Sequence, residues 1–353
     1  MVILGVVIVL GLLAWLVSSG SSGTGNQADS TSDEATVAAT DQSATDQGSS
    51  AEPTDSASTA GDGPESTPAV VGTIATGAHP VEAEVVDDGL WVQVDGGLER
   101  YPASGDDPNA TTTVDLGGNG NDIVPGDGVL YVTLMDAQEV AVIDLTTDEV
   151  DRIPVGGGPL AGALLDDTLW VTAHGDFDGA PGALVPIADG AAGTPIPLDE
   201  KPFAVIAYDD ALWVTFAESD GLAQIDPATS TVTARYSVGP GPVDVQAIDD
   251  QLWVTLGDAN QVAIVDPTDG TVVDSVDVGT RPWKLAEGFG AVWVSNRGDE
   301  IGPGSVSRID PSSLMVTGTA ATEVQTDELA IGPSDVFAVN YGSGSVSVIS
   351  PGL

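Results

Sequence analysis

The chain contains 353 residues, of which 54 are Asp or Glu and only 8 are Lys or Arg, so its formal net charge is −46. This charge excludes nucleic acid as a partner, because too few cations are present to neutralise phosphates, and it excludes docking on an anionic membrane through a basic patch. The lack of Cys excludes disulfides and thiolate metal sites. With 42% hydrophobic residues, the chain is apolar enough to form one large or two medium domains.

Residues 1–17 form an unbroken apolar segment. As a helix it would be ~26 Å long, close to the ~30 Å hydrocarbon core of a bilayer. Two interpretations stay open: a short transmembrane anchor, which we favour, and the apolar part of a secretory signal that is cleaved near Ser19. No Lys or Arg precedes the segment, so the charge pattern that usually sets membrane orientation is missing.

Residues 18–67 are rich in Ser, Thr, Ala, Gly and acidic residues and contain no Lys or Arg. Val37 is their only bulky apolar residue, so this segment cannot bury enough surface to offset its conformational entropy. We expect a disordered acidic linker with an r.m.s. span of ~40 Å. It would serve either as a stalk that holds a domain clear of a membrane or as a plain spacer.

Residues 68–353 contain an internal repeat. Each unit has an aromatic residue in an apolar run such as Leu-Trp-Val-Thr at 212–215, and successive aromatics are 39 to 44 residues apart. The seven aromatic positions are Trp91, Tyr131, Trp170, Trp213, Trp253, Trp293 and Phe337. Such a period indicates a repeat architecture. We expect the repeated Trp residues to be core residues between units rather than ligand platforms.

Three further anchors keep the same register. Eleven residues before the aromatic, five units have Pro, and the two weaker units have Gly120 and Thr326. An Asp-Asp pair precedes the aromatic in four units, at 87–88, 166–167, 209–210 and 249–250. An Asp-Pro step follows it in three units, at 226–227, 266–267 and 310–311. Asp and Pro both favour turns, so the repeated Asp pairs are interpreted as turn formers and not as catalytic dyads.

A period near 40 with regularly spaced turn signals predicts four short strands per unit. In the unit of Trp253 we expect strands at 243–248, 252–256, 261–265 and 271–278. Such a sheet has two apolar faces, and a closed ring of sheets covers both. The sequence therefore predicts an all-β fold, a seven-bladed β-propeller with four-stranded antiparallel blades, preceded by an apolar helix and the disordered linker.

The last unit ends soon after its third strand, at 345–349, so its fourth strand is missing from the C-terminal end. Residues 69–80 match the pattern of residues 271–282 without a gap. We therefore predict that an N-terminal strand at 70–76 completes the seventh blade. This closure would join the two ends of the domain and remove an exposed sheet edge.

Residues 338–349 (Ala-Val-Asn-Tyr-Gly-Ser-Gly-Ser-Val-Ser-Val-Ile) resemble the YVTN-type β-propeller repeat, and residues 131–133 (Tyr-Val-Thr) and 293–296 (Trp-Val-Ser-Asn) are similar. The resemblance implies a surface, periplasmic or secreted binding protein. It extends at a distance to the virginiamycin B lyases, seven-bladed propellers that use His, Glu and a metal. Because His79 and His174 both lie outside a shared motif, no lyase residue is transferred to this chain.

The innermost strands of a propeller line a central channel, and the second residue after each Pro position should lie near one end of it. These ring residues are Glu82, Asp122, Ala161, Ala204, Asp244, Lys284 and Glu328. The residue before each of them adds three further candidates, Phe203, Trp283 and Asp327. Four carboxylates and one Lys at one level predict a site for a cation or a small cationic ligand, with Ca²⁺ favoured because all donors are oxygens. The simpler alternative is a solvated channel mouth in an acidic protein.

These patterns predict a membrane-anchored or exported propeller that acts as an extracytoplasmic binding or scaffold domain. It would lie at the extracytoplasmic face of the cell membrane, in the periplasm or outside the cell, as a monomer. Its partner would be a protein, a peptide or a small molecule, and also the membrane if residues 1–17 stay uncleaved. The alternative is a metal-dependent hydrolase, lactonase or lyase with its site in the channel. A third hypothesis is a sensor domain whose signalling part is encoded upstream.

Overall fold

A computed structural model describes residues 66–175, 181–299 and 301–352. The predicted anchor or signal segment and the predicted linker up to residue 65 lie outside these ranges. Every regular element within them is a β-strand. Among the described residues there is no helix long and apolar enough to cross a bilayer.

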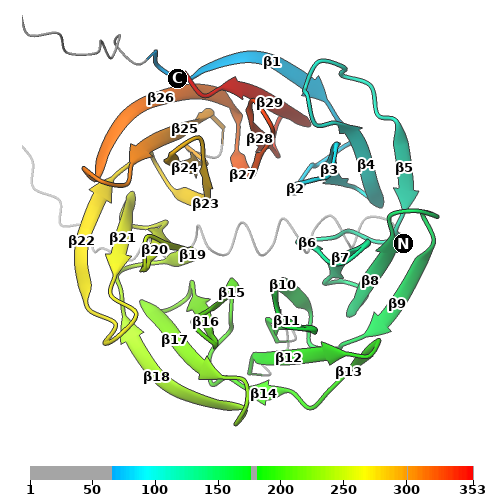
Figure 1. Ribbon diagram of the computed structural model, residues 1–353, viewed down its shortest axis with the longest axis vertical. Helices are drawn as coiled ribbons and strands as arrows, with labels where there is room; N and C mark the ends of the chain where they lie inside the picture. Colours follow the sequence, from blue (N-terminus) through cyan, green and yellow to red (C-terminus); the bar gives the residue numbers. More distant parts are fainter. Residues whose placement is uncertain (1–65, 176–180, 300, 353) are drawn as a thin grey trace, which may run out of the picture. The chain divides into compact units, whose positions relative to one another are not determined.

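The strands form seven antiparallel sheets, which are arranged as blades around a central axis (Figure 1). Blade 1 consists of β2 (Glu82–Val86), β3 (Gly89–Val94), β4 (Gly97–Pro102) and β5 (Thr112–Asp115). Blade 2 consists of β6 (Ile123–Pro125), β7 (Val129–Leu134), β8 (Glu139–Asp144) and β9 (Val150–Pro154). Blade 3 consists of β10 (Pro159–Leu165), β11 (Thr168–Ala173), β12 (Ala183–Ala188), β13 (Ala191–Ala192) and β14 (Ile196–Pro197).

The other four blades repeat this order, with the first strand innermost (Figure 1). Blade 4 consists of β15 (Val205–Tyr208), β16 (Ala211–Phe216), β17 (Gly221–Asp226) and β18 (Thr231–Ser237). Blade 5 consists of β19 (Pro242–Ile248), β20 (Gln251–Leu256), β21 (Gln261–Val265) and β22 (Val272–Asp277). Blade 6 consists of β23 (Pro282–Gly288), β24 (Ala291–Asn296), β25 (Pro303–Asp310) and β26 (Met315–Val324). Blade 7 consists of β27 (Thr326–Ile331), β28 (Val336–Asn340), β29 (Ser345–Ser350) and β1 (Ala69–Ala75).

The predicted seven-bladed propeller is therefore confirmed, and the strand bounds expected for blade 5 agree with the structure to within one residue. Blade 3 departs from the expected four strands. Its outermost strand is divided into β13 and β14, which both pair with β12. Gly193 and Pro195 lie between the two pieces. Gly weakens a strand and Pro has no N–H for the ladder, so this composition accounts for the interruption.

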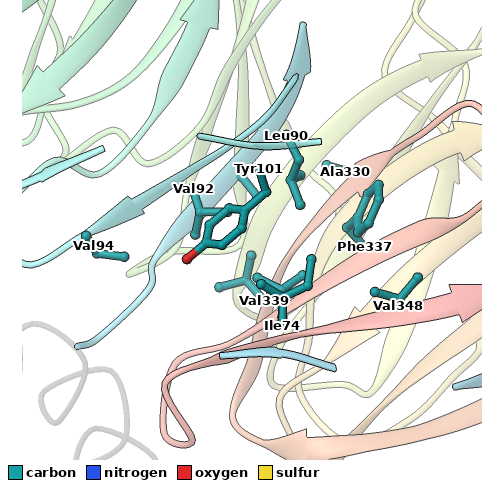
Figure 2. Packing of buried hydrophobic residues seen from close by; sticks show 11 residues of the cluster. Ile74, Leu90, Val92, Val94, Tyr101, Ala330, Phe337, Val339 and Val348 are labelled. Carbon is teal, nitrogen blue, oxygen red and sulfur yellow. The ribbon is translucent and has the colours of Figure 1, made fainter. Parts of the chain in front are cut away.

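The predicted closing strand is also confirmed, because β1 pairs antiparallel with β29 and completes blade 7. At the seam between blades 7 and 1, Ile74 of β1 packs in one cluster with Tyr101 and Phe337 (Figure 2). Ile74 is only 1% exposed. The C-terminal end is held by Arg308, whose guanidinium donates to the carbonyl of Gly352 at 2.8 Å. The ring is thus closed by core packing as well as by strand pairing.

Seven clusters of buried apolar side chains lie between neighbouring blades, one at each blade-to-blade contact. The repeated Trp residues belong to them and are at most 6% exposed. They are Trp91, Trp170, Trp213, Trp253 and Trp293. Tyr131 at the equivalent place in blade 2 is only partly buried. The interpretation of the repeated Trp residues as inter-blade core is confirmed.

The Asp-Asp pairs form two-residue turns between the first and second strands. In blades 4 and 5 both residues have positive φ, with 50° and 57° at Asp209 and Asp210 and 49° and 61° at Asp249 and Asp250. Such turns match the twist of a hairpin. In the Asp-Pro turns, a carboxylate oxygen of Asp226 accepts a hydrogen bond from the amide two residues on at 2.8 Å. Both motifs are therefore turn formers, as predicted.

Candidate functional site

A repeated hydroxyl holds the ring residues in place. The Thr215 hydroxyl, two residues after the aromatic of blade 4, accepts a hydrogen bond from the amide of the ring residue Ala204 at 3.0 Å. It donates one to the carbonyl of Val243 in blade 5 at 2.8 Å. The same two bonds are made in four other blades by Thr133, Thr172, Thr255 and Ser295. Each hydroxyl thus fixes the start of an inner strand and joins it to the next blade.

The structure brings the five charged ring residues to one level of the channel. Lys284 Nζ lies 3.3 Å from Glu328 Oε1. The carboxylates of Glu82, Asp122 and Asp244 are also close enough to act on this ammonium. Burial alone would lower the pKa of Lys284, but the four carboxylates together outweigh it and raise that pKa well above its usual value. Lys284 is therefore charged and is the central cation of the ring.

Glu82 and Glu328 form a buried carboxyl pair, at 4% and 5% exposure. Burial raises the pKa of Glu82 well above its usual value, and the neighbouring Glu328 raises it further. Burial also raises the pKa of Glu328 to about 7, although Lys284 opposes this. Burial and the neighbouring carboxyl group thus act in the same direction on Glu82, and Lys284 opposes them at both residues. These two groups are the ring carboxyls that burial favours most strongly in the protonated form.

Asp122 and Asp244 connect blades. Asp122 Oδ2 accepts a hydrogen bond from the amide of Gly162 in blade 3 at 2.7 Å, and Asp244 Oδ2 accepts one from the amide of Leu285 in blade 6 at 2.9 Å. Burial raises the pKa of both carboxyl groups, while Lys284 and these amides oppose the shift. One acceptor of each carboxylate thus has a structural role, which the sequence spacing did not indicate.

A cavity of about 480 Å³ extends from this level along the inner strands. Asp122, Asp244 and Lys284 line its polar part, and apolar residues of β6, β10, β15, β23 and β27 line the rest. The ring residues of blades 3 and 4 are Ala161 and Ala204, which also line the cavity. Their small side chains leave space where the other five blades carry longer ones. The lining of the cavity therefore combines charged and apolar side chains.

Two further carboxylates line the cavity and were missed by the sequence argument. Glu84 lies two residues after Glu82 on β2, and Glu287 lies near the end of β23. Burial raises the pKa of Glu84 to about 7, with Lys284 opposing the shift. Alternation along an inner strand places residues two apart on the same side, so this spacing was the available signal for Glu84.

The remaining three candidates, Phe203, Trp283 and Asp327, do not line this cavity among the described residues. The rings of Phe203 and Trp283 meet edge to face, with centroids 5.5 Å apart. The guanidinium of Arg297 lies 4.3 Å from the Trp283 ring centroid, and its Nε is 2.7 Å from Asp327 Oδ1. Burial raises the pKa of Asp327, and Arg297 opposes this. These residues form a separate packed cluster, and the buried Arg297 was also missed from the sequence.

The donor set does not fit the metal that the ring composition suggested. Across residues 66–175, 181–299 and 301–352, no three His, Cys, Asp or Glu side chains are placed to hold a metal ion. The ammonium of Lys284 lies where a cation among the carboxylates would lie. Of the two histidines, His79 Nδ1 lies 2.8 Å from Asp95 Oδ2. His174 is 6% exposed, and burial lowers its pKa to about 4. We therefore assign no Ca²⁺ site.

No family model matches the chain, and no curated protein matches it in sequence. Solved structures do match. A streptogramin B lyase structure has a TM-score of 0.63 at 16% identity and covers 77% of this chain and 93% of its own. Hydrazine synthase of Kuenenia stuttgartiensis has a TM-score of 0.59 at 16% identity, and the match covers 77% of this chain and 95% of that one. The Cps50 (Swd1) β-propeller domain of Myceliophteria thermophila has a TM-score of 0.64 at 13% identity, and the match covers 80% of this chain and 98% of that one.

These identities establish the fold and nothing finer. The chain is a seven-bladed β-propeller, and the three similar structures include two enzymes and a domain with no stated enzymatic activity. Because one fold carries many functions, the function has to be argued from the cavity and its side chains.

Proposed function

We propose that this protein is an extracytoplasmic binding propeller of the YVTN type whose ligand occupies the central cavity. The cavity carries the proposal, since it is about 480 Å³ in volume and combines apolar walls with a few charged groups. Ligand sites in proteins typically have this volume and composition. The ring residues that border it are fixed by hydroxyl and carboxylate bonds between blades, so the site is preorganised.

The proposed location and family rest on the sequence. The apolar segment 1–17 and the acidic, Ser/Thr-rich segment 18–67 support an anchored or exported domain on a stalk. The Tyr-Val-Thr and Trp-Val-Ser-Asn strands at 131–133 and 293–296 support the YVTN type. We expect a monomer, since the closed ring covers both faces of every sheet and leaves only the outermost strands at an edge. Protease accessibility in cells whose outer envelope has been removed but whose cytoplasmic membrane is intact tests the location, and cleavage of the propeller only after that membrane is lysed would contradict it.

The alternative of a metal-dependent hydrolase, lactonase or lyase is not favoured by any side chain of the described channel. The carboxylates that would hold the metal are instead bonded to neighbouring amides and to Lys284. The binding function is therefore the better supported of the two.

The experiment is a thermal-shift and calorimetric titration of the full chain in mild detergent with three compounds of one shape: choline, 3,3-dimethylbutan-1-ol and 3,3-dimethylbutanoate. At least one should raise the melting temperature in a concentration-dependent manner. Ala204→Trp, which fills the cavity, should abolish this shift, while Ala228→Trp at an exposed turn should preserve it. Binding that survives Ala204→Trp in a folded protein would contradict the cavity as the site.

A further inference from the structure

The cavity has an excess of negative charge. Its lining includes four carboxylates, those of Glu84, Asp122, Asp244 and Glu287, and one ammonium, that of Lys284. Acidic side chains therefore outnumber basic ones in the lining by three. Among the described residues that line the cavity, there is no other Lys or Arg. A ligand that enters the cavity loses its hydration water and experiences a negative electrostatic potential.

The carboxylates differ in the hydrogen bonds and ion pairs that they already make. Asp122 and Asp244 each accept a hydrogen bond from a backbone amide of the following blade. Glu328 forms an ion pair with Lys284. Glu84 is half-buried on β2 and accepts no hydrogen bond from the described residues, and Lys284 acts on its carboxylate only through space. A carboxylate held partly out of water without a donor favours any cation that can reach it.

The walls restrict what kind of cation this is. β10 and β15 contribute Ala161, Leu164 and Ile206 to the lining of the cavity. A hydrated inorganic cation gains nothing from such walls, and the described residues offer no set of oxygen donors arranged around a metal. An organic cation with an apolar body gains binding free energy from both kinds of side chain. Its apolar body buries surface against the apolar residues, and its cationic head meets Glu84.

We propose that the ligand of the cavity is a small organic cation with an apolar body, of the quaternary ammonium or alkylamine class, and that Glu84 is the residue that selects for its charge. This proposal rests on the proposed function, since it names the ligand class of the same cavity. Glu84 contacts the cationic head, and the walls of β10 and β15 contact the apolar body. Glu287, exposed near the end of β23, adds to the attraction at the solvent side.

The test uses choline and its neutral isostere 3,3-dimethylbutan-1-ol, which have nearly the same shape, with 3,3-dimethylbutanoate as the anionic counterpart. Isothermal titration of the full chain should give affinities in the order cation, neutral compound, anion. Glu84→Gln should weaken choline binding by about ten- to hundredfold, as for the loss of one charged interaction. It should leave binding of the neutral compound within about twofold. Glu149→Gln, an exposed control, should change neither affinity.

The outcomes separate the two proposals. If the three compounds bind equally well, or if folded Glu84→Gln keeps full affinity for choline, the charge-selective role of Glu84 is refuted while the cavity remains the binding site. If none of the three binds, the proposed function fails and this inference fails with it. Should Glu84→Gln not fold, Glu84→Asp, which keeps the charge on a shorter side chain, together with the cation-to-neutral affinity ratio of the wild type decides the question.

Discussion

The hydroxyl of Thr215 should contribute strongly to the stability of the propeller. Thr215 is 0% exposed, and its hydroxyl accepts from the amide of Ala204 and donates to the carbonyl of Val243. Thr215→Val keeps the shape of the side chain and removes only these two bonds. The bond to the carbonyl of Val243 is buried and the bond from the amide of Ala204 is partly buried, so both groups lose their partner in a place with little or no water.

An unsatisfied buried polar group costs about 1–3 kcal/mol. Two such groups should lower the free energy of unfolding by about 2–4 kcal/mol in Thr215→Val, after partial relaxation of the strand start. Urea unfolding followed by Trp fluorescence measures this, because five of the chain's seven Trp residues are buried between blades. The midpoint should fall while the slope with denaturant stays constant.

Thr215→Ser is the matched control, since it keeps the hydroxyl and loses one methyl group, at a cost of about 1 kcal/mol. Blade 6 already uses Ser295 at this position. The hydroxyl argument would be refuted if Thr215→Val unfolded within about 0.5 kcal/mol of the wild type, or if Thr215→Ser were as destabilising as Thr215→Val.

Three other predictions concern the seam, the buried carboxyls and the turns. Ile74→Ala, which opens a space at the closing strand, should cost about 2–5 kcal/mol in urea unfolding, whereas Val71→Ala on the same strand, at a site 64% exposed, should cost less than about 0.5 kcal/mol; equal losses would show that the seam is not tightly packed. Burial raises the folded-state pKa of Glu84 and Glu328 to about 7, against 4.5 in the unfolded chain. Between these pH values the folded state binds more protons than the unfolded state. The stabilising contribution of the two groups is therefore complete below pH 4.5 and is lost as the pH rises to 7. Glu84→Gln should therefore flatten the fall of the melting temperature between pH 4.5 and 7.5, and an unchanged profile would contradict the pKa shift of Glu84. Replacing the pair at 249–250 by Asn-Gly keeps positive φ at both positions but places at 250 a Gly, which adopts it without steric cost, and should raise the stability by about 0.5–1 kcal/mol, with a loss of stability as the contrary result.

Part of the candidate site followed from the sequence. Counting two residues past each Pro position placed Glu82, Lys284 and Glu328 at one level, and the structure has these side chains in mutual contact or electrostatic range. The residue before the ring position in blade 6, Trp283, was grouped with them, but it lies in a separate cluster with Arg297. Successive residues of a strand point to opposite faces, so neighbours in sequence need not share a site.

The position two residues past Pro does not identify Glu84, although alternation along the regular strand β2 does, and it does not give the charge balance of the cavity. In four blades the ring residue lies within a register shift between the first and second strands, at 159–162, 242–245, 282–285 and 326–329. Blade 1 has no such shift, and Glu82 and Glu84 pair in regular register with Gln93 and Trp91. A bulge turns a side chain in a way that spacing does not reveal. Which carboxylates face the cavity therefore depended on the local backbone of each blade.

The sequence by itself determined the number of blades, the order of their strands, the places of the turns and the closure by the N-terminal strand. These are local features repeated seven times, and a sheet with two apolar faces can be satisfied only by neighbours on both sides. Only the tertiary structure decided that Lys284 is the cation of the ring, that Asp122 and Asp244 bond to the next blade, and that Glu84 is left without a donor. Those facts depend on contacts between inner strands that are at least about 40 residues apart in the chain, and strand twist, bulges and burial set them after the ring has closed.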